Sequence, residues 1–183
     1  MIGCFALIRD KYTTFDSMLS ICNLDSTLSN GENAMSGDFD FEYGTWSVHH
    51  RRLLDRLAGC QAWEEFDGTA SCAPILGGVG NIEEASMPST GTIGMALRLF
   101  DQTTRLWSIY WSTNLTGRLE APVVGRFEDG VGVFEGDDEL QGEPIRVRFV
   151  WDEITADSAR WTQSFRRVHD SEWQANWVMI FNR

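Results

Sequence analysis

The sequence predicts an all-β protein, an antiparallel up-and-down barrel of about eight to ten strands that follows an N-terminal extension. Three observations support this fold class. From Asp38 onward, short segments alternate apolar and polar residues with period two. Turn-forming residues separate these segments, and no long stretch shows convincing helical periodicity. A meander of this length normally closes into a barrel, because closure removes its exposed edges.

The candidate strands follow one another with short connections. They are residues 44–56, 60–75, 79–87, 92–100, 105–113, 122–128, 131–136, 143–154, 158–167 and 173–182. Turn residues occupy 77–78, 88–91, 101–104, 114–117, 128–130 and 169–172. Residues 53–57 fit this scheme least well, since this stretch also suits a helical turn.

The chain has eight tryptophans, and period two gathers many of them on one face of the strands. Trp107 and Trp111 share a face in 105–113. The other strands repeat the pattern with Trp151, with Trp161 and Gln163, and with Trp173, Ala175 and Trp177, the last three opposite Gln174 and Asn176. Such a wall either surrounds a ligand or fills the barrel with its own side chains.

Composition limits the classes of partner. A chain of 183 residues suits one domain, and its formal charge of −12 argues against nucleic acid and anionic membranes as partners. No apolar run reaches the length of a membrane span, and the start of the chain lacks the features of a signal peptide. The four cysteines show neither disulfide nor zinc spacing. We therefore expect a cytoplasmic protein, and leave a homodimer open.

Residues 1–37 differ from the barrel region of 38–183. Phe15, Met18, Leu19 and Cys22 fall on one face of a helix, and a polar linker follows up to Gly37. Two interpretations stay open. Either translation begins at Met35 and the extension is an artefact of the gene model, or a short amphipathic helix packs on the barrel or closes its mouth.

Gly44-Thr45-Trp46 resembles the Gly-x-Trp motif of the calycins, the lipocalin-type barrels. The segments DFDFEYGTWSVHHRRL, WEEFDGT and ILGGVGN also resemble an uncharacterised bacterial lipocalin-like family over most of residues 38–183. The resemblance implies a calycin-like barrel without an established activity, in which Trp46 plugs the closed end and packs against Arg183. The Thr-Asp-Tyr motif of lipocalins is absent, as are their secretion signal and disulfides, which favours an intracellular barrel.

Two polar positions follow Trp46 on the inward side of the first strand. If Trp46 faces inward, period two turns His50, Arg52 and Leu54 inward as well. Arg52 could then bind an anionic group of a ligand while His50 exchanges a proton. Alternatively, the strand kinks or both residues lie at a solvated rim. In WEEFDGT, either Glu64 or Glu65 turns inward, where it could act in acid–base chemistry, or the run forms a solvated rim.

These patterns predict that the barrel binds one small, largely apolar molecule, aromatic or polyketide-like, without a metal or cofactor. The candidate ligand-binding residues are Trp107, Tyr110, Trp111, Trp151, Trp161, Gln163 and Trp177. The alternative is a cofactor-independent cyclase or isomerase that uses the same cavity, with His50, Arg52 and Glu65 as its catalytic residues. If side chains fill the lumen, a structural or protein-interaction role is the better class.

Overall fold

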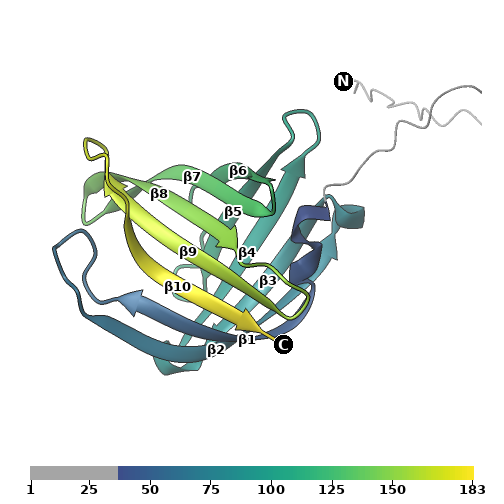
Figure 1. Cartoon of the computed structure of the whole chain (residues 1–183), viewed down its shortest axis with the longest axis horizontal. Helices are drawn as coiled ribbons and strands as arrows, with labels where there is room; N and C mark the ends of the chain where they lie inside the picture. The colour runs from purple at the N-terminus through teal and green to yellow at the C-terminus, as the bar shows by residue number, and fades with distance from the viewer. Residues whose placement is uncertain (1–36) are drawn as a thin grey trace, which may run out of the picture. The chain divides into compact units, whose positions relative to one another are not determined.

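The computed structural model describes residues 37–183, which form a closed antiparallel barrel of ten strands (Figure 1). Each strand pairs with its neighbours in the chain, and pairing of β1 with β10 closes the barrel. The strands are β1 (Gly44–Leu53), β2 (Trp63–Ile75), β3 (Gly80–Met87), β4 (Thr92–Asp101), β5 (Leu106–Thr113), β6 (Val123–Glu128), β7 (Val131–Leu140), β8 (Glu143–Asp152), β9 (Ser158–Arg167) and β10 (Gln174–Asn182). The predicted fold class is confirmed.

All ten predicted strands are present, and most differ from the prediction only at their ends. β1 ends at Leu53 rather than at residue 56, and this changes one predicted orientation. Leu53 is buried, whereas Leu54 is 61% exposed, so the prediction that Leu54 turns inward is wrong. The period-two pattern stops where the backbone leaves the strand, because alternation of side chains requires an extended chain.

β10 departs from simple alternation near its start. The register with β9 shifts between Ala175 and Trp177, so one extra residue is inserted there. As a result Asn176 is fully buried and Ala175 is exposed, the reverse of the predicted faces. Trp173 lies between the guanidinium groups of Arg148 and Arg166, 4.1 and 4.9 Å from its ring centroid. A β-bulge has this effect because it moves every residue on one side of it to the opposite face.

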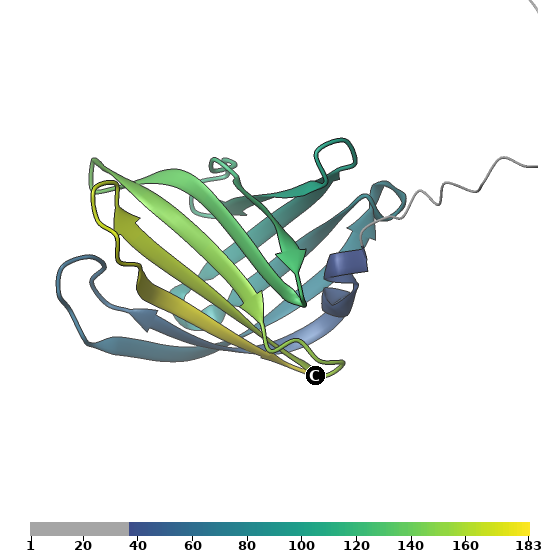
Figure 2. The same cartoon turned by 45° about the horizontal axis from the view of Figure 1, so that its top comes forward.

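A short 3-10 helix, η1 (Gly37–Glu42), covers the end of the barrel where β1 begins (Figure 2). Its Phe39 is buried among the rings of Trp107, Phe127 and Phe134, with centroid distances of 4.9, 5.0 and 5.8 Å. The contacts with Trp107 and Phe127 are edge-to-face and the contact with Phe134 is stacked, and both kinds are favourable beyond the area they bury. Side chains therefore pack this end of the barrel solid.

Trp46 and Arg183 complete the closed end. The Trp46 indole donates a hydrogen bond of 2.8 Å to the carbonyl of Glu42, and the Arg183 guanidinium lies 4.3 Å from the Trp46 ring centroid. Arg183 also donates to the carbonyls of Phe41 and Tyr43, at 2.9 and 2.7 Å. These contacts fasten η1 to β1 through Trp46 and to the residue after β10, Arg183; β1 and β10 are the strands whose pairing closes the barrel. The positive φ of Gly44, +107°, allows the turn from η1 into β1.

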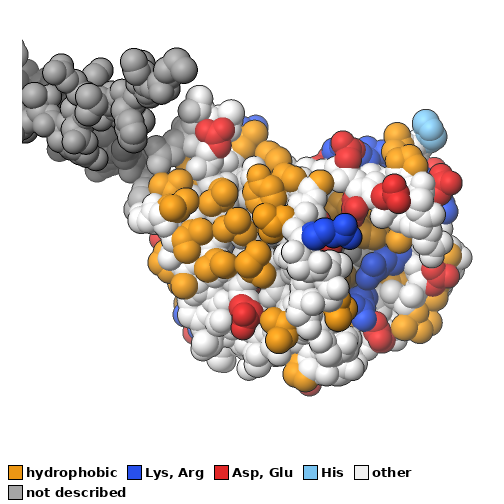
Figure 3. All heavy atoms as spheres, turned by 180° about the vertical axis from the view of Figure 1, so that it is seen from behind, with side chains coloured by type: hydrophobic (Ala, Val, Ile, Leu, Met, Phe, Trp, Pro, Cys, Tyr) orange, Lys and Arg blue, Asp and Glu red, His pale blue; other side chains and the backbone are white. Residues whose placement is uncertain are grey.

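The outer wall carries apolar side chains across three neighbouring strands. Register places Ile82, Leu97 and Tyr110 side by side on β3, β4 and β5. The view in Figure 3 shows hydrophobic side chains gathered on one face of the molecule. In the part of the chain that the structure describes, no helix has the length and apolar character needed to cross a membrane. The predicted helix and linker of the N-terminal extension lie outside the described residues, apart from Gly37, which begins η1.

Candidate functional site

A cavity occupies the half of the barrel away from η1. Its lining includes residues of both the strands and the β5–β6 connection, among them Glu120 and Ala121 near its mouth. The cavity has a volume of about 90 Å³, smaller than the roughly 300–1,000 Å³ of most small-molecule sites, so any ligand that it holds is small.

Arg98 lies where the packed end meets the cavity, at the centre of a cluster of buried polar side chains. Its guanidinium is 2.7 Å from Oε2 and 2.8 Å from Oε1 of Glu42, donates to Glu83, and donates to Asn81 Oδ1 at 3.0 Å. All four residues are at most 3% exposed. We call Arg98, Glu42, Glu83 and Asn81 the floor cluster, because Arg98 contacts the Phe39 ring below it, 5.0 Å from the centroid, and lines the cavity above it.

The floor cluster has two carboxyl groups for one guanidinium. Burial raises the pKa of Glu42 well above its ordinary value, and the neighbouring carboxylate of Glu83 adds to this, although Arg98 opposes it. Burial alone lowers the pKa of Arg98, but the two carboxylates outweigh burial and raise it above the ordinary value. Arg98 therefore stays charged, and the Glu42 carboxyl group holds a proton more readily than a free carboxylate does.

His50 lies on the cavity wall and is 2% exposed. The Trp177 indole donates to its Nδ1 at 3.3 Å, which fixes the neutral ring with its proton on Nε2. The ring stacks on Phe66 with a centroid distance of 4.7 Å. Burial, then the charges of Arg52 and His49, lower the pKa of His50 from 6.5 to about 4. His50 is therefore uncharged at neutral pH.

The other predicted polar residues lie outside the cavity. Arg52 forms an ion pair with Glu64, with 2.7 Å between Nη2 and Oε1, and stands over the rings of Phe66 and Trp177 at 5.2 Å. It sits at the rim rather than in the cavity lining. Glu65 points outward, where it lies 3.8 Å from His49 and 3.6 Å from Arg51. The structure thus brings His50 to the cavity and separates Glu65 from it.

Most of the predicted ring residues do line the cavity. These are Trp111, Trp151, Trp161 and Trp177, together with Gln163. Trp107 belongs instead to the packed end, where its indole donates to Asp38 Oδ2 at 3.0 Å. Tyr110 is on the outer wall, because its neighbours Ile109 and Trp111 take the inward side of β5. Gln163 donates to the buried Asn176 side chain at 2.8 Å, so the bulge in β10 supports the cavity wall.

Two glycines make room for cavity side chains. A β-carbon at Gly94 would overlap the Trp111 ring, and one at Gly68 would lie 2.9 Å from Nε2 of His50. Each glycine therefore lets the side chain on the neighbouring strand lie flat across its backbone. The positions of Trp111 and His50 depend on these two residues.

Sequence reasoning missed the charged residues of the cavity. Besides Glu83 and Arg98, the lining includes Glu120, Asp137 and Asp138. The sequence contained one pattern that could have placed Glu83 and Arg98 on the inward face. On β3 and β4 the apolar residues Ile82 and Leu97 occupy positions of opposite parity to Glu83 and Arg98, so the charged residues face the same side as Phe100. Glu120 lies in the β5–β6 connection, which carries no periodic pattern, whereas Asp138 lies on β7 at the same parity as the buried Phe134.

Among residues 37–183, no group of three or more metal-ligating side chains is arranged to hold a metal ion. Cys60 and Cys72 are free thiols, and burial raises the pKa of Cys72 to about 12. No protein-family model matches this chain, and no curated protein is similar to it in sequence.

Proposed function

We propose that this protein binds one small, largely apolar molecule inside the barrel, as a lipocalin-like binding protein would. The observation that supports this is that side chains fill only one half of the aromatic-lined interior of the barrel. Phe39 and the rings around it fill the closed end, whereas the other half keeps a cavity with aromatic walls. A concave, mainly apolar site with a few placed polar groups is the usual form of a small-molecule site.

The walls supply affinity through ring contacts. Trp161 makes edge-to-face contacts with Phe149 and Trp177, at centroid distances of 4.8 and 5.9 Å, and so forms a continuous aromatic surface. Burial of a ligand of about ten heavy atoms against such rings, at roughly 0.3–0.6 kcal/mol per atom, would give dissociation constants from about tens of micromolar to several millimolar.

Indole and 2-phenylethanol are suitable neutral probes, since both are small aromatic molecules. We expect each to bind in isothermal titration calorimetry, and Ala121→Trp to weaken binding by about tenfold or more because this exposed residue lines the mouth. Ala156→Trp, in the exposed turn at the closed end, is the matched control and should bind as the wild type does. Absence of binding, or equal binding by the Ala121→Trp variant, would contradict the proposal.

The floor cluster favours a second candidate, an isomerase or cyclase that acts by proton transfer. Its two carboxyl groups are buried, one of them, Glu83, lines the cavity, and the pKa of Glu42 is raised. Glu83, the carboxyl group of the cluster that reaches the cavity, could take a proton from the carbon next to a bound carbonyl group and return a proton there. Such an enzyme should exchange the methyl protons of acetophenone for deuterium in D₂O, followed by NMR, and Glu83→Gln should abolish the exchange. Exchange no faster than in buffer would remove this candidate.

A further inference from the structure

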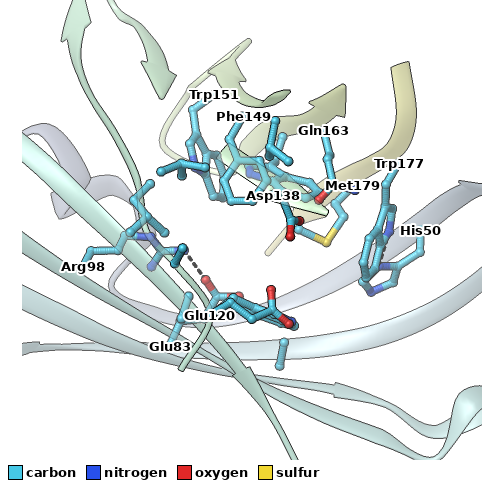
Figure 4. Close-up of a pocket in the computed structure, with 18 of the residues that line it drawn as sticks. His50, Glu83, Arg98, Glu120, Asp138, Phe149, Trp151, Gln163, Trp177 and Met179 are labelled. Carbon is cyan, nitrogen blue, oxygen red and sulfur yellow. Dashed lines mark hydrogen bonds and ion pairs between the residues drawn. The ribbon is translucent and has the colours of Figure 1, made fainter. Parts of the chain in front are cut away.

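We infer that the ligand of this cavity carries a positive charge, as a primary or quaternary ammonium group on a small aromatic or otherwise apolar body. The inference rests on the proposed function, binding of a small molecule in the cavity, and adds the chemical class of that molecule. It follows from the charges that line the cavity and from the rings between them (Figure 4).

The ionisable side chains of the lining are mostly acidic. They are His50, Glu83, Arg98, Glu120, Asp137 and Asp138. The one guanidinium is bound on two sides by carboxyl groups of the floor cluster, so it has little positive charge to offer a ligand. The buried imidazole accepts a hydrogen bond from Trp177 and is neutral. Within the described part of the chain, no lining residue therefore presents an uncompensated positive charge to the cavity.

Two carboxylates near the mouth are left without a cation in the described structure. Glu120 lies beside Trp111, because its backbone N–H donates to the Trp111 carbonyl at 2.8 Å. Asp138, on β7, accepts only from the backbone N–H of Glu139, at 2.7 Å. Asp137, by contrast, is paired with Arg146 at 2.7 Å. Figure 4 shows Glu120 and Asp138 between Arg98 at one end of the cavity and Trp177 at the other.

The pKa of Glu120 agrees with this distribution of charge. Desolvation by the surrounding protein, and then the negative charge of Asp138, raise the pKa of Glu120. A cation placed between the two carboxylates would relieve both effects, since opposite charge favours the ionised form. An anion there would strengthen the repulsion. The mouth of the cavity thus discriminates against ligands of negative charge.

The rings next to these carboxylates suit an ammonium group. Phe149, Trp161 and Trp177 form the edge-to-face surface described above, and Trp111 adjoins Glu120. The face of an indole attracts cations through its quadrupole, and clusters of such rings are the usual binding sites for methylated ammonium groups. The apolar body of the ligand would lie against the same walls.

Two arginines near the mouth do not reverse this conclusion. Arg52 is bound to Glu64, and Arg56 stands over the Phe165 ring at 5.6 Å; neither lines the cavity. In one of the two interpretations of the sequence, Arg52 turns inward and binds an anionic group of the ligand; in the other, it lies at a solvated rim. With Arg52 paired at the rim and carboxylates in the lining, the structure favours the opposite charge.

Three probes with the same phenylethyl body test the inference: 2-phenylethylammonium, 2-phenylethanol and 3-phenylpropanoate. In calorimetric titrations at neutral pH and low salt, we expect the ammonium to bind about tenfold more tightly than the alcohol, and the carboxylate most weakly. The double variant Glu120→Gln/Asp138→Asn should reduce the preference for the ammonium to about twofold or less, with the alcohol unaffected. Both residues are exposed enough for the barrel to fold normally.

A matched control changes the net charge equally at the other end of the barrel. Asp129→Asn/Asp157→Asn alters two exposed turn residues at the closed end and should retain the full preference. If the alcohol binds and the ammonium binds no better, or if its preference survives in Glu120→Gln/Asp138→Asn, the inference is overturned while the proposed function stands. Tightest binding of the carboxylate, lost in Arg56→Gln, would overturn it in favour of an anionic ligand. If none of the probes binds, the proposed function itself fails.

Discussion

The stability of the barrel should fall as His50 is protonated. Its pKa is lowered from 6.5 to about 4 in the folded protein, so the folded state disfavours the imidazolium relative to the unfolded state. Above the unfolded-state pKa, His50 is neutral in both states and the unfolding free energy keeps its full value. As the pH falls toward the folded-state pKa, His50 takes up a proton only in the unfolded state, so the unfolding free energy decreases. Two-state linkage gives a loss of about 2 kcal/mol in unfolding free energy between about pH 7.5 and pH 5.

Urea denaturation followed by tryptophan fluorescence measures this effect when the wild type is compared with His50→Gln. Acidic groups titrate in the same range, so the informative quantity is the pH dependence of the difference between the two proteins. His49→Gln is the matched control, because His49 is exposed on the outer wall and pairs with Asp67 at 2.8 Å. If the difference between wild type and His50→Gln stays constant across this range, then His50 is not held neutral by burial, and the account of the cavity wall is wrong.

Three further substitutions test other contacts. Arg98→Met leaves two buried carboxyl groups without their cation and should lower the unfolding free energy by about 3–5 kcal/mol in urea, whereas Arg126→Met, at an exposed ion pair with Glu128, should cost less than about 1 kcal/mol. Gly94→Ala should displace the Trp111 ring, cost about 1–3 kcal/mol, and weaken indole binding in calorimetry. Arg183→Met removes two hydrogen bonds and the ring contact on Trp46, and should lower thermal stability by about 1–3 kcal/mol; an unchanged melting temperature would show that η1 holds without it.

The fold could be predicted because each strand has a recognisable pattern in its own stretch of sequence. Alternation with period two and turn residues between segments depend on neighbours in the chain, and both are visible without knowledge of tertiary structure. The inward face of β1 followed the same rule, so His50 was placed correctly. The rule failed at Leu54 and at Asn176, where the strand ends or bulges and the period no longer holds.

The site could be predicted only in part, because its charged residues meet across the barrel. Glu42 precedes β1, Glu83 lies on β3, and Arg98 lies on β4; only the register of β3 with β4 and the seating of η1 bring them together. The same limit applied to the rings. Trp107 and Trp111 have the same parity on one strand, yet Phe39 packs against the first and the second borders the cavity. Which of them borders the cavity is decided by η1, which lies outside the strand pattern.

The bulge in β10 shows how one residue shapes the mouth of the cavity. Without it, Trp173 would share the inward face with Trp177, and a second indole would occupy the open end. With it, Trp173 lies between two arginines on the outer wall, and Gln174 accepts a hydrogen bond of 2.6 Å from the backbone N–H of Leu57. That bond fastens the β1–β2 connection across the strands. The bulge therefore clears the entrance and holds the segment beside it, while the buried Asn176 that it creates bonds to the cavity wall through Gln163.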